Sequence, residues 1–393
     1  MQDPVVIAGM ARTPIGNFQG AFTGVAATAL GSHAIKAALD RGGIKASDVE
    51  EVYMGCVLPA GLGQAPARQA SLGAGLPPSA GCVTVNKVCG SGMKTLMMAH
   101  DAILAGSIKV AVAGGMEAMT NAPHILPTGR AGIKFGHGEI LDHMAFDGLE
   151  DAYKKRTAMG VFAEKCAREW QFSKADQDEY SMRSVTRAQK AIKDGKFRSE
   201  IAPYEVQTRK GVVTVSDDEK PGTVDAAKIP TLKAAFEKDG TVSAGSSSAI
   251  SDGAAAFVVM RESEAKKRGA TPIAKVIAHS THSQEPEWFT TAPVDSIKSV
   301  LAKAGWSVSD VDLFEINEAF AVVPMAAMRE LKIPADKVNI HGGAIALGHP
   351  IGASGARIIV TLINALKETG KKRGVASLCI GGGEATSVAV ELV

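Results

Sequence analysis

The chain has 393 residues, 46% of them hydrophobic and 21% charged, and its 43 basic and 41 acidic side chains leave a net charge of +2. These values are typical of a globular protein of two or more domains and give no sign of a nucleic-acid-binding surface. No apolar run is long enough to span a membrane, and the five scattered cysteines, without a CxxC pair, are typical of neither a disulfide framework nor a zinc site.

The first predicted element is a strand that starts at Val5. Because the strand begins almost at once, the sequence leaves no room for a signal peptide, and the free cysteines favour a reducing compartment. We expect a cytoplasmic protein, with a removed organellar targeting segment as the alternative. The segment after the strand, Ala8–Pro14, is not a GxGxxG loop, and no GxxxxGK[ST] loop occurs in the chain. A dehydrogenase or NTPase is therefore disfavoured.

A cysteine then stands in a sharp turn between a predicted strand and a predicted helix. Residues 82–85 alternate as a short strand does, and apolar residues recur with helical spacing from Met93 to Leu104. Cys89 opens the Gly-Ser-Gly turn between them, where the free N–H groups of a helix N-terminus favour a thiolate. The alternative is a buried cysteine that acts as a small hydrophobe, which is more common for a lone cysteine.

Residues 119–249 differ in character, being rich in charge, glycine and turns. They predict two helices, about 157–170 and 174–194. The second has Ser173 as its N-cap, Asp176 in its first turn and Gly195 as its stop. We interpret this region as an insertion that holds a ligand over the active face.

An internal repeat relates the two ends of the chain. Residues 35–49 and 297–311 align without a gap, and each is typical of a helix that ends at a glycine and turns into a strand. A second similarity relates the turn Gly90–Gly92 in the N-terminal part to Ala353–Gly355 in the C-terminal part. At the position that corresponds to Cys89, the C-terminal copy has Gly352. The sequence thus predicts two related α/β halves, with the nucleophile kept only in the first.

Three more motifs follow in the C-terminal half. Asn317 lies between apolar residues at a strand-to-helix transition, and its alternative role is to cap the next helix. His349 stands between a glycine and a proline in a glycine-dense loop, where a base for a cysteine is more expected than a merely structural histidine. Cys379 precedes the turn Gly381–Gly383, whose N–H groups are suited to bind an oxyanion.

Taken together, these residues resemble the thiolase family over essentially the whole chain. The resemblance rests on motifs in a fixed order, which are Arg12–Gly16, Asn86–Gly92, Asn317–Phe320, Gly348–Pro350 and Cys379–Gly381. It implies a duplicated five-layer αβαβα fold with an inserted loop domain. The N-terminal half would cover 1–118, continued by 250–270, the loop domain 119–249 over the coenzyme A (CoA) site, and the C-terminal half 271–393.

The resemblance, strongest to the acetoacetyl-CoA-forming branch, also implies an activity. This is the Claisen condensation of two acetyl-CoA to acetoacetyl-CoA and CoA, together with the reverse thiolysis, in the metabolism of fatty acids, ketones or polyhydroxyalkanoate precursors. Cys89 would carry the acyl group, His349 would activate it, and Cys379 would act on the α-carbon. One oxyanion hole would pair His349 with a water oriented by Asn317, and the other would use the N–H groups of Cys89 and Gly381.

The implied ligands are CoA thioesters as substrates, with no metal and no redox cofactor. No nucleic acid or membrane partner is implied, and a homo-oligomer, tetramer or dimer, is expected, with segment 120–145 in tetramer contacts. The residues expected along CoA and around the acyl group are Ser248, Met159, Leu149, Phe236, Ala244, Ala319 and Phe320.

Two departures from the family pattern bear on chain length. Ala158 stands where many acetoacetyl-CoA thiolases have His or Asn, and the run Gly115–Met119 differs from the usual one, so Ala158 and Met116 are candidates for admitting longer or branched acyl groups. A 3-ketoacyl-CoA thiolase of broad chain length in fatty-acid degradation is the first alternative, and a non-catalytic lipid- or CoA-binding relative is the second. A ketoacyl synthase is disfavoured by Cys379 in its Cys-x-Gly turn.

Overall fold

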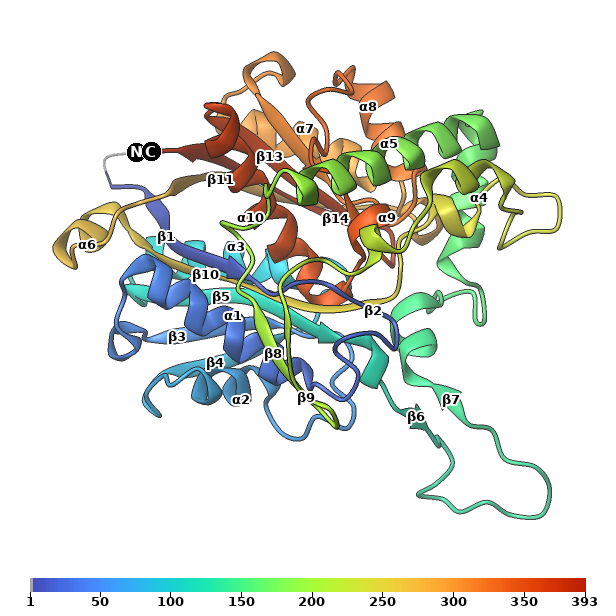
Figure 1. The fold of residues 1–393 in the computed structure, drawn as a ribbon, viewed down its shortest axis with the longest axis horizontal. Coiled ribbons are helices and arrows are strands. Elements are labelled where there is room, and N and C mark those ends of the chain that lie inside the picture. Colours follow the sequence, from blue (N-terminus) through green and yellow to red (C-terminus); the bar gives the residue numbers. More distant parts are fainter. Residues whose placement is uncertain (1–2) are drawn as a thin grey trace.

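The strands of the N-terminal half form a five-stranded arrangement in the computed structural model, which describes residues 3–393 (Figure 1). Their order is β4 (Gly81–Val85), β3 (Glu51–Gly55), β5 (Val110–Ala118), β10 (Ser251–Arg261) and β1 (Val5–Arg12), with the short β2 (Gly16–Asn17) beside β10. Strands β4, β3 and β5 are parallel, whereas β10 runs antiparallel to both β5 and β1.

The C-terminal half repeats this pattern. Its strands are β12 (Leu313–Ile316), β13 (Arg373–Ile380), β14 (Glu384–Leu392) and β11 (Ala274–Ser283). As in the first half, one parallel pair (β12 and β13) is followed by two antiparallel pairs. An isolated parallel bridge from Phe314 to Val338 stands in the place of β4. Among the described residues, the two groups of strands pair with each other through a short antiparallel contact between β1 and β11.

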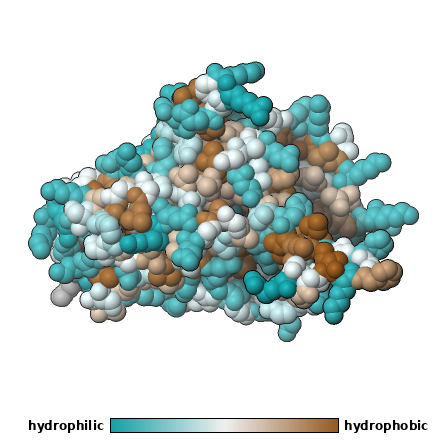
Figure 2. All heavy atoms as spheres, turned by 90° about the horizontal axis from the view of Figure 1, so that it is seen from below, coloured by the Kyte–Doolittle hydropathy of each residue, from teal (hydrophilic) through white to brown (hydrophobic). Residues whose placement is uncertain are grey.

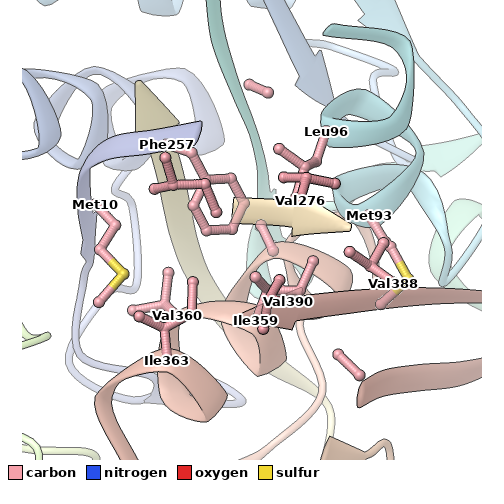
Figure 3. Close-up of a cluster of buried hydrophobic side chains, with 14 of the residues drawn as sticks. Met10, Met93, Leu96, Phe257, Val276, Ile359, Val360, Ile363, Val388 and Val390 are labelled. Atoms are coloured by element: carbon pink, nitrogen blue, oxygen red, sulfur yellow. The ribbon is translucent and has the colours of Figure 1, made fainter. Parts of the chain in front are cut away.

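Helices fill three layers around the two groups of strands. Helices α3 (Ser91–Leu104) and α10 (Ile351–Thr369) lie between the halves, and their side chains form one buried cluster with residues of both groups of strands (Figures 1 and 3). Helices α1 (Ala27–Gly42) and α2 (Pro66–Gly73) cover the outer face of the N-terminal strands. Helices α7 (Ala292–Ala304) and α8 (Val322–Leu331) cover that of the C-terminal strands. The layers are therefore αβαβα, as predicted.

The burial of α10 follows from its sequence, which is mostly apolar or small on every side, with Arg357 and Asn364 as the exceptions within its buried part. Residues 351–366 are all buried, which is expected of a helix that has strands and helices around it. Glycines bring α10 close to α3, since a Cβ on Gly92 would lie 2.9 Å from Ala356 N and one on Gly355 would lie 2.4 Å from Met93 N. The two central helices thus pack with their backbones nearly in contact.

The predicted repeat has the same structure in both copies. Helix α1 ends at the left-handed Gly43 (φ 63°) and α7 ends at the left-handed Gly305 (φ 68°). A one-turn 3-10 helix follows each glycine, and the chain then enters β3 in the first half and β12 in the second. Left-handed backbone at a helix end strongly favours glycine, so the glycine shared by both copies fixes the same turn twice.

Residues 119–249 pass over one end of this core. They contain β6 (His124–Ile125), β7 (Leu141–Asp142), α4 (Met159–Glu169), α5 (Lys174–Lys193) and the hairpin of β8 (Tyr204–Thr208) and β9 (Gly211–Val215). Ser173 is the N-cap of α5, as predicted, and with Asp176 it forms a reciprocal capping box. Two short helices complete the described chain, α6 (Glu262–Lys267) after β10 and α9 (Ala344–Leu347) before α10.

The segment between β6 and β7 projects from the body of the molecule (Figure 1). Its large apolar side chains are exposed, with Phe135 fully accessible and Ile140 67% accessible. Seen from below, hydrophobic atoms gather toward the same end of the molecule (Figure 2). Within residues 3–393, no helix combines the length and the apolar character that a membrane crossing requires.

Candidate active site

The turn that carries Cys89 is held by its own backbone and by one serine. Val88 has a positive φ of 45°, a strained conformation for a β-branched residue and one that is often found at functional sites. The Ser91 hydroxyl donates to Val88 O (2.7 Å) and accepts from Lys87 N (2.8 Å), which fixes the loop. Cys89 is thereby presented one residue before the cap of α3, as predicted for a strand–turn–helix elbow.

His349 is buried and fixed through both ring nitrogens. Its Nδ1 lies 2.6 Å from the hydroxyl oxygen of Ser354, and that hydroxyl donates to Pro350 O at 2.9 Å. Because the hydroxyl has a single proton, Nδ1 carries the proton between His349 and Ser354. Nε2 is left with its lone pair, and Asn317 Nδ2 lies 3.4 Å from it.

Asn317 does not cap a helix. The N-cap of α8 is Ala321, so the alternative role of Asn317 as a capping residue is wrong. Its backbone N–H donates to Ser377 O on β13, which turns the side chain toward His349. Asn317 Oδ1 is buried without a partner, so it is free to receive a hydrogen bond from a bound water or ligand.

Cys379 and Gly381 come from the end of β13, on the C-terminal side of the same site. Cys379 is 1% exposed, and its pKa is raised well above the usual value by burial and by the nearby sulfur of Cys89. Burial also raises the pKa of Cys89, to about 11, although the backbone N–H groups of Gly381 and Cys89 oppose the shift. These two N–H groups therefore lie close to the Cys89 sulfur.

The electrostatics keep all three reactive groups neutral at pH 7. Burial lowers the pKa of His349 to about 3, and the positive charge of Arg357 adds to this effect. Cys89 and Cys379 remain thiols for the reason given above. The cavity is thus lined by a neutral imidazole and two thiols, which suits transfer of a proton in the reaction rather than a preformed ion pair.

These residues surround one cavity of about 300 Å³ whose walls are almost wholly apolar. The rings of Phe236 and Phe289 each pack edge-to-face against the ring of Phe320, and the three rings together enclose one side of the cavity. The cavity brings together most of the predicted residues, which are Cys89, His349, Cys379, Gly381, Leu149, Met159, Phe236, Ser248, Ala319 and Phe320. Asn317 lies behind His349 and Ala244 lies outside this cavity.

A larger hollow continues the cavity toward the surface. It has a volume of about 580 Å³ and shares five residues with the cavity, Phe236, Ser247, Ser248, Ala249 and Ile250. Ala244 and Lys220 lie on its wall, and the amino group of Lys220 donates to Ile345 O at 2.6 Å. Burial lowers the pKa of Lys220 to about 8. The cavity and the hollow together therefore extend from Cys89 to Lys220.

Of the two residues proposed to admit longer or branched acyl groups, one lines the cavity and the other does not. Ala158 lines the cavity, whereas Met116 is fully buried in the outer cluster, against Gly31 of α1. The side chains of a strand alternate between its two faces, and Met116 points to the outer face of β5. Met119, a little further along the same run, lines the cavity instead.

Sequence analysis missed the role of Glu117. This buried carboxylate accepts hydrogen bonds from the N–H groups of Val57, Leu58 and Gly352, at 2.8 to 3.1 Å. It therefore fixes the start of α10 next to His349 and the turn after β3. A charged residue in the otherwise apolar run of β5 is the signal that would have identified it. Ser354 and Lys220 had no comparable signal.

Comparison with known proteins agrees with this geometry. The family description "Thiolase, N-terminal domain" matches residues 5–263 and "Thiolase, C-terminal domain" matches residues 270–392. The chain therefore belongs to the thiolase family and has the duplicated thiolase fold.

Relatives and a solved structure match over full length. The chain is 46% identical to an acetyl-CoA acetyltransferase of Rhizobium meliloti (strain 1021), with all of both chains covered. It is 48% identical to acetyl-CoA acetyltransferase 2 of Arabidopsis thaliana, covering 99% of this chain and 97% of that one. The crystal structure of the Bacillus anthracis acetyl-CoA acetyltransferase superposes with a TM-score of 0.96 at 39% identity, covering 100% and 99% of the two chains.

Proposed function

We propose that this acyltransferase is an acetyl-CoA C-acetyltransferase, which condenses two acetyl-CoA into acetoacetyl-CoA and CoA and catalyses the reverse thiolysis. The observation that carries the proposal is the meeting of Cys89, His349 and Cys379 around one apolar cavity, with the N–H of Gly381 directed at Cys89. The printed names of the full-length relatives point to the same reaction.

In the first half-reaction, Cys89 becomes acylated. Its thiol is protonated at neutral pH, so a base must take the proton as the sulfur attacks the acetyl carbonyl. The lone pair on Nε2 of His349 takes it, because Ser354 holds the other nitrogen protonated. The tetrahedral oxyanion accepts from the N–H groups of Cys89 and Gly381, and its collapse expels the CoA thiolate, which takes the proton from His349.

In the second half-reaction, Cys379 acts on the incoming acetyl-CoA. Cys379 first gives its thiol proton to Nε2 of His349, and its thiolate then removes a proton from the α-carbon. The resulting carbanion attacks the carbonyl of acyl-Cys89 and forms acetoacetyl-CoA, and the expelled Cys89 thiolate takes the proton back from His349. The high pKa of Cys379 makes its thiolate a stronger base, although it also makes that thiolate scarce. While Nε2 of His349 carries this proton, His349 and a water held at the unpartnered Oδ1 of Asn317 would stabilise the enolate oxygen.

We propose that CoA occupies the hollow that leads to the cavity. The shared wall, which includes Ser248, would run along the pantetheine arm, and Ser248 is held in place by its N–H, which donates to Ala319 O at 2.9 Å. Lys220 stands where the path widens, and its ammonium group is suited to the phosphates of CoA.

The test is CoA-dependent cleavage of acetoacetyl-CoA beside longer straight and 2-methyl-branched 3-ketoacyl-CoAs, with Cys89→Ser as the control. Turnover concentrated on acetoacetyl-CoA supports the proposal. Because Ala158 leaves the cavity wall small, the second candidate is a 3-ketoacyl-CoA thiolase of broad chain length, and a flat or rising profile would favour it. No turnover on any of these substrates would overturn both.

We also propose a homo-oligomer, a tetramer or a dimer, in the cytoplasm. The projecting segment between β6 and β7 supports assembly, because Ile133, Phe135 and Ile140 are apolar side chains exposed close together in sequence on it. Light scattering after gel filtration tests the assembly, and a monomer at micromolar concentration would contradict it. The five cysteines, all free thiols, support a reducing compartment.

A further inference from the structure

A group of side chains of the types that bind metal ions lies far from the active site, near the C-terminal end of α3, the helix that follows Cys89. His100 and Asp101 are neighbours near the end of α3, and His279 faces them from β11. Asp101 Oδ1 lies 2.9 Å from His100 Nδ1 and 2.8 Å from His279 Nε2. At a rise of 1.5 Å per residue, the group is roughly 18 Å along α3 from Cys89.

We propose that His100, Asp101 and His279 form a binding site for a divalent transition-metal ion of the zinc class. Two imidazoles and one carboxylate are a donor set that Zn²⁺ prefers, and three protein ligands leave a fourth position for water. This ion would take no part in the transfer of acyl groups. It would instead link the central helix of the N-terminal half to a strand of the C-terminal half.

The geometry is close to what an ion needs. The three ligand atoms all lie within 4.8 Å of one another, whereas a tetrahedral ion with bonds of about 2.1 Å holds its ligands about 3.4 Å apart. The two rings are perpendicular with centroids 5.1 Å apart, so each directs a different nitrogen at the same carboxylate. Small rotations of the side chains are enough to replace the two hydrogen bonds with an ion.

The surroundings keep the ligands available. His100 is 6% exposed and therefore fixed, whereas the Asp101 side chain is 58% exposed and gives an ion access from solvent. The His279 side chain is 17% exposed and reaches the same carboxylate oxygen from β11, so all three ligand atoms meet at the edge of the site that solvent reaches.

One nearby cation works against the site. The Lys303 ammonium donates to His279 O at 3.0 Å, and its charge disfavours a dication beside that ring. We therefore expect micromolar rather than nanomolar affinity. His100 Nε2 is buried with no hydrogen-bond partner among the described residues, so binding through Nδ1 would place an unpaired N–H there, which also weakens the site.

The test is titration of the full-length protein with Zn²⁺ by calorimetry, and with Co²⁺ by visible absorption. Both are done in a Cys89→Ser, Cys379→Ser background so that the active-site thiols do not compete. We expect one ion per chain, with affinity roughly tenfold or more weaker in Asp101→Asn and in His279→Gln. The matched control is His282→Gln on the same strand, whose ring contacts Gln284 instead and whose replacement should leave binding unchanged.

Thermal unfolding gives a second measurement that does not depend on activity. Because an ion that binds only the folded state stabilises it, Zn²⁺ should raise the melting temperature of the parent and of His282→Gln but not of Asp101→Asn. The asparagine keeps the size and hydrogen-bonding capacity of the aspartate, so a folded variant is expected. Absence of binding at 100 µM Zn²⁺, roughly a hundred times the expected dissociation constant, or equal binding by Asp101→Asn, would overturn the proposal.

Discussion

The Nδ1 atom of His349 lies 2.6 Å from the hydroxyl oxygen of Ser354, one turn along the helix that His349 precedes. The same hydroxyl donates to Pro350 O, so Ser354 decides which nitrogen of the imidazole is free to accept a proton. Neither the Gly348–Pro350 motif nor the Cys89 elbow contains this serine. The relationship makes Ser354 a positioning residue for the base, and it is testable without changing any group that touches the substrate.

Replacing Ser354 by alanine should lower kcat roughly tenfold, because the imidazole loses the partner that fixes its tautomer and orientation. The change in KM should be smaller, since Ser354 does not line the cavity. Steady-state thiolysis of acetoacetyl-CoA measures both constants. The control is Ser280→Ala, which removes an equally buried hydroxyl that bonds Ser296 O on α7. An equal loss in both variants would show that the effect is structural.

Alkylation of Cys89 by iodoacetamide should become faster with pH and should not level off near neutrality. The thiol has its pKa raised to about 11 and the imidazole beside it has its pKa lowered to about 3, so no thiolate–imidazolium pair forms between them. Below its pKa the thiolate fraction grows about tenfold per pH unit. Rates from pH 7 to 9, read by mass spectrometry of the Cys89 peptide, measure this. A plateau below pH 8 would contradict it.

Glu117→Gln should remove one source of pH-dependent stability. Burial raises the pKa of Glu117 to about 7, against the opposing hydrogen bonds of three N–H groups, whereas the unfolded carboxyl titrates near 4.5. The native state therefore keeps a proton that the unfolded state has lost, and wild-type stability falls as pH rises through this window. Relative to wild type, the variant should gain about 3 kcal/mol in unfolding free energy between pH 4.5 and 7. Urea unfolding at fixed protein concentration measures the difference, and no change with pH would argue against the shift.

Gly92→Ala should destabilise the protein by about 1–3 kcal/mol, because the new Cβ would press on the backbone of α10. The contact lies between the two central helices, which are packed on both sides and therefore cannot easily move apart. Gly222→Ala is the matched control, since a Cβ there would have no heavy atom within 4 Å. Melting temperatures of the two variants give the answer. A neutral Gly92→Ala would show that the central helices can separate at low cost.

Ala158→His should narrow the cavity and change substrate preference. The added ring would occupy space next to Met159, so kcat/KM for longer 3-ketoacyl-CoAs should fall relative to acetoacetyl-CoA, by roughly tenfold in the ratio. The same substrates measured with wild type provide the reference. A ratio that stays constant would place the chain-length limit elsewhere on the cavity wall.

Local patterns in the sequence were sufficient for much of the fold. The capping pair Ser173 and Asp176, and the helix-ending glycines Gly43 and Gly305, act within a few residues of themselves, so their structures follow from the sequence nearby. The reactive residues Cys89 and Cys379 stand in short turns rich in glycine, and these turns identify them as candidate reactive residues from the sequence alone.

The residues that were missed or misplaced depend on distant partners. Glu117 matters because it meets the start of α10, more than 200 residues away in sequence. Lys220 reaches Ile345 O, and nothing near Lys220 in the sequence indicates that contact. Met116 was misplaced because one step along β5 decides between the cavity side and the outer core. Asn317 has a residue type common at helix caps, but its strand ends too far before α8 for that role.

The second copy of the nucleophile turn cannot regain a nucleophile. At Gly352, the counterpart of Cys89, a Cβ would lie 2.5 Å from the Glu117 carboxylate and 2.9 Å from Met116 O. The first half thus occupies the space that a side chain in the second half would need, while the second half supplies the imidazole and the second thiol to the first. Each half depends on the other for a complete set of reactive groups, so neither half expressed alone should turn over substrate, and mixing the separated halves should restore turnover only if they reassemble.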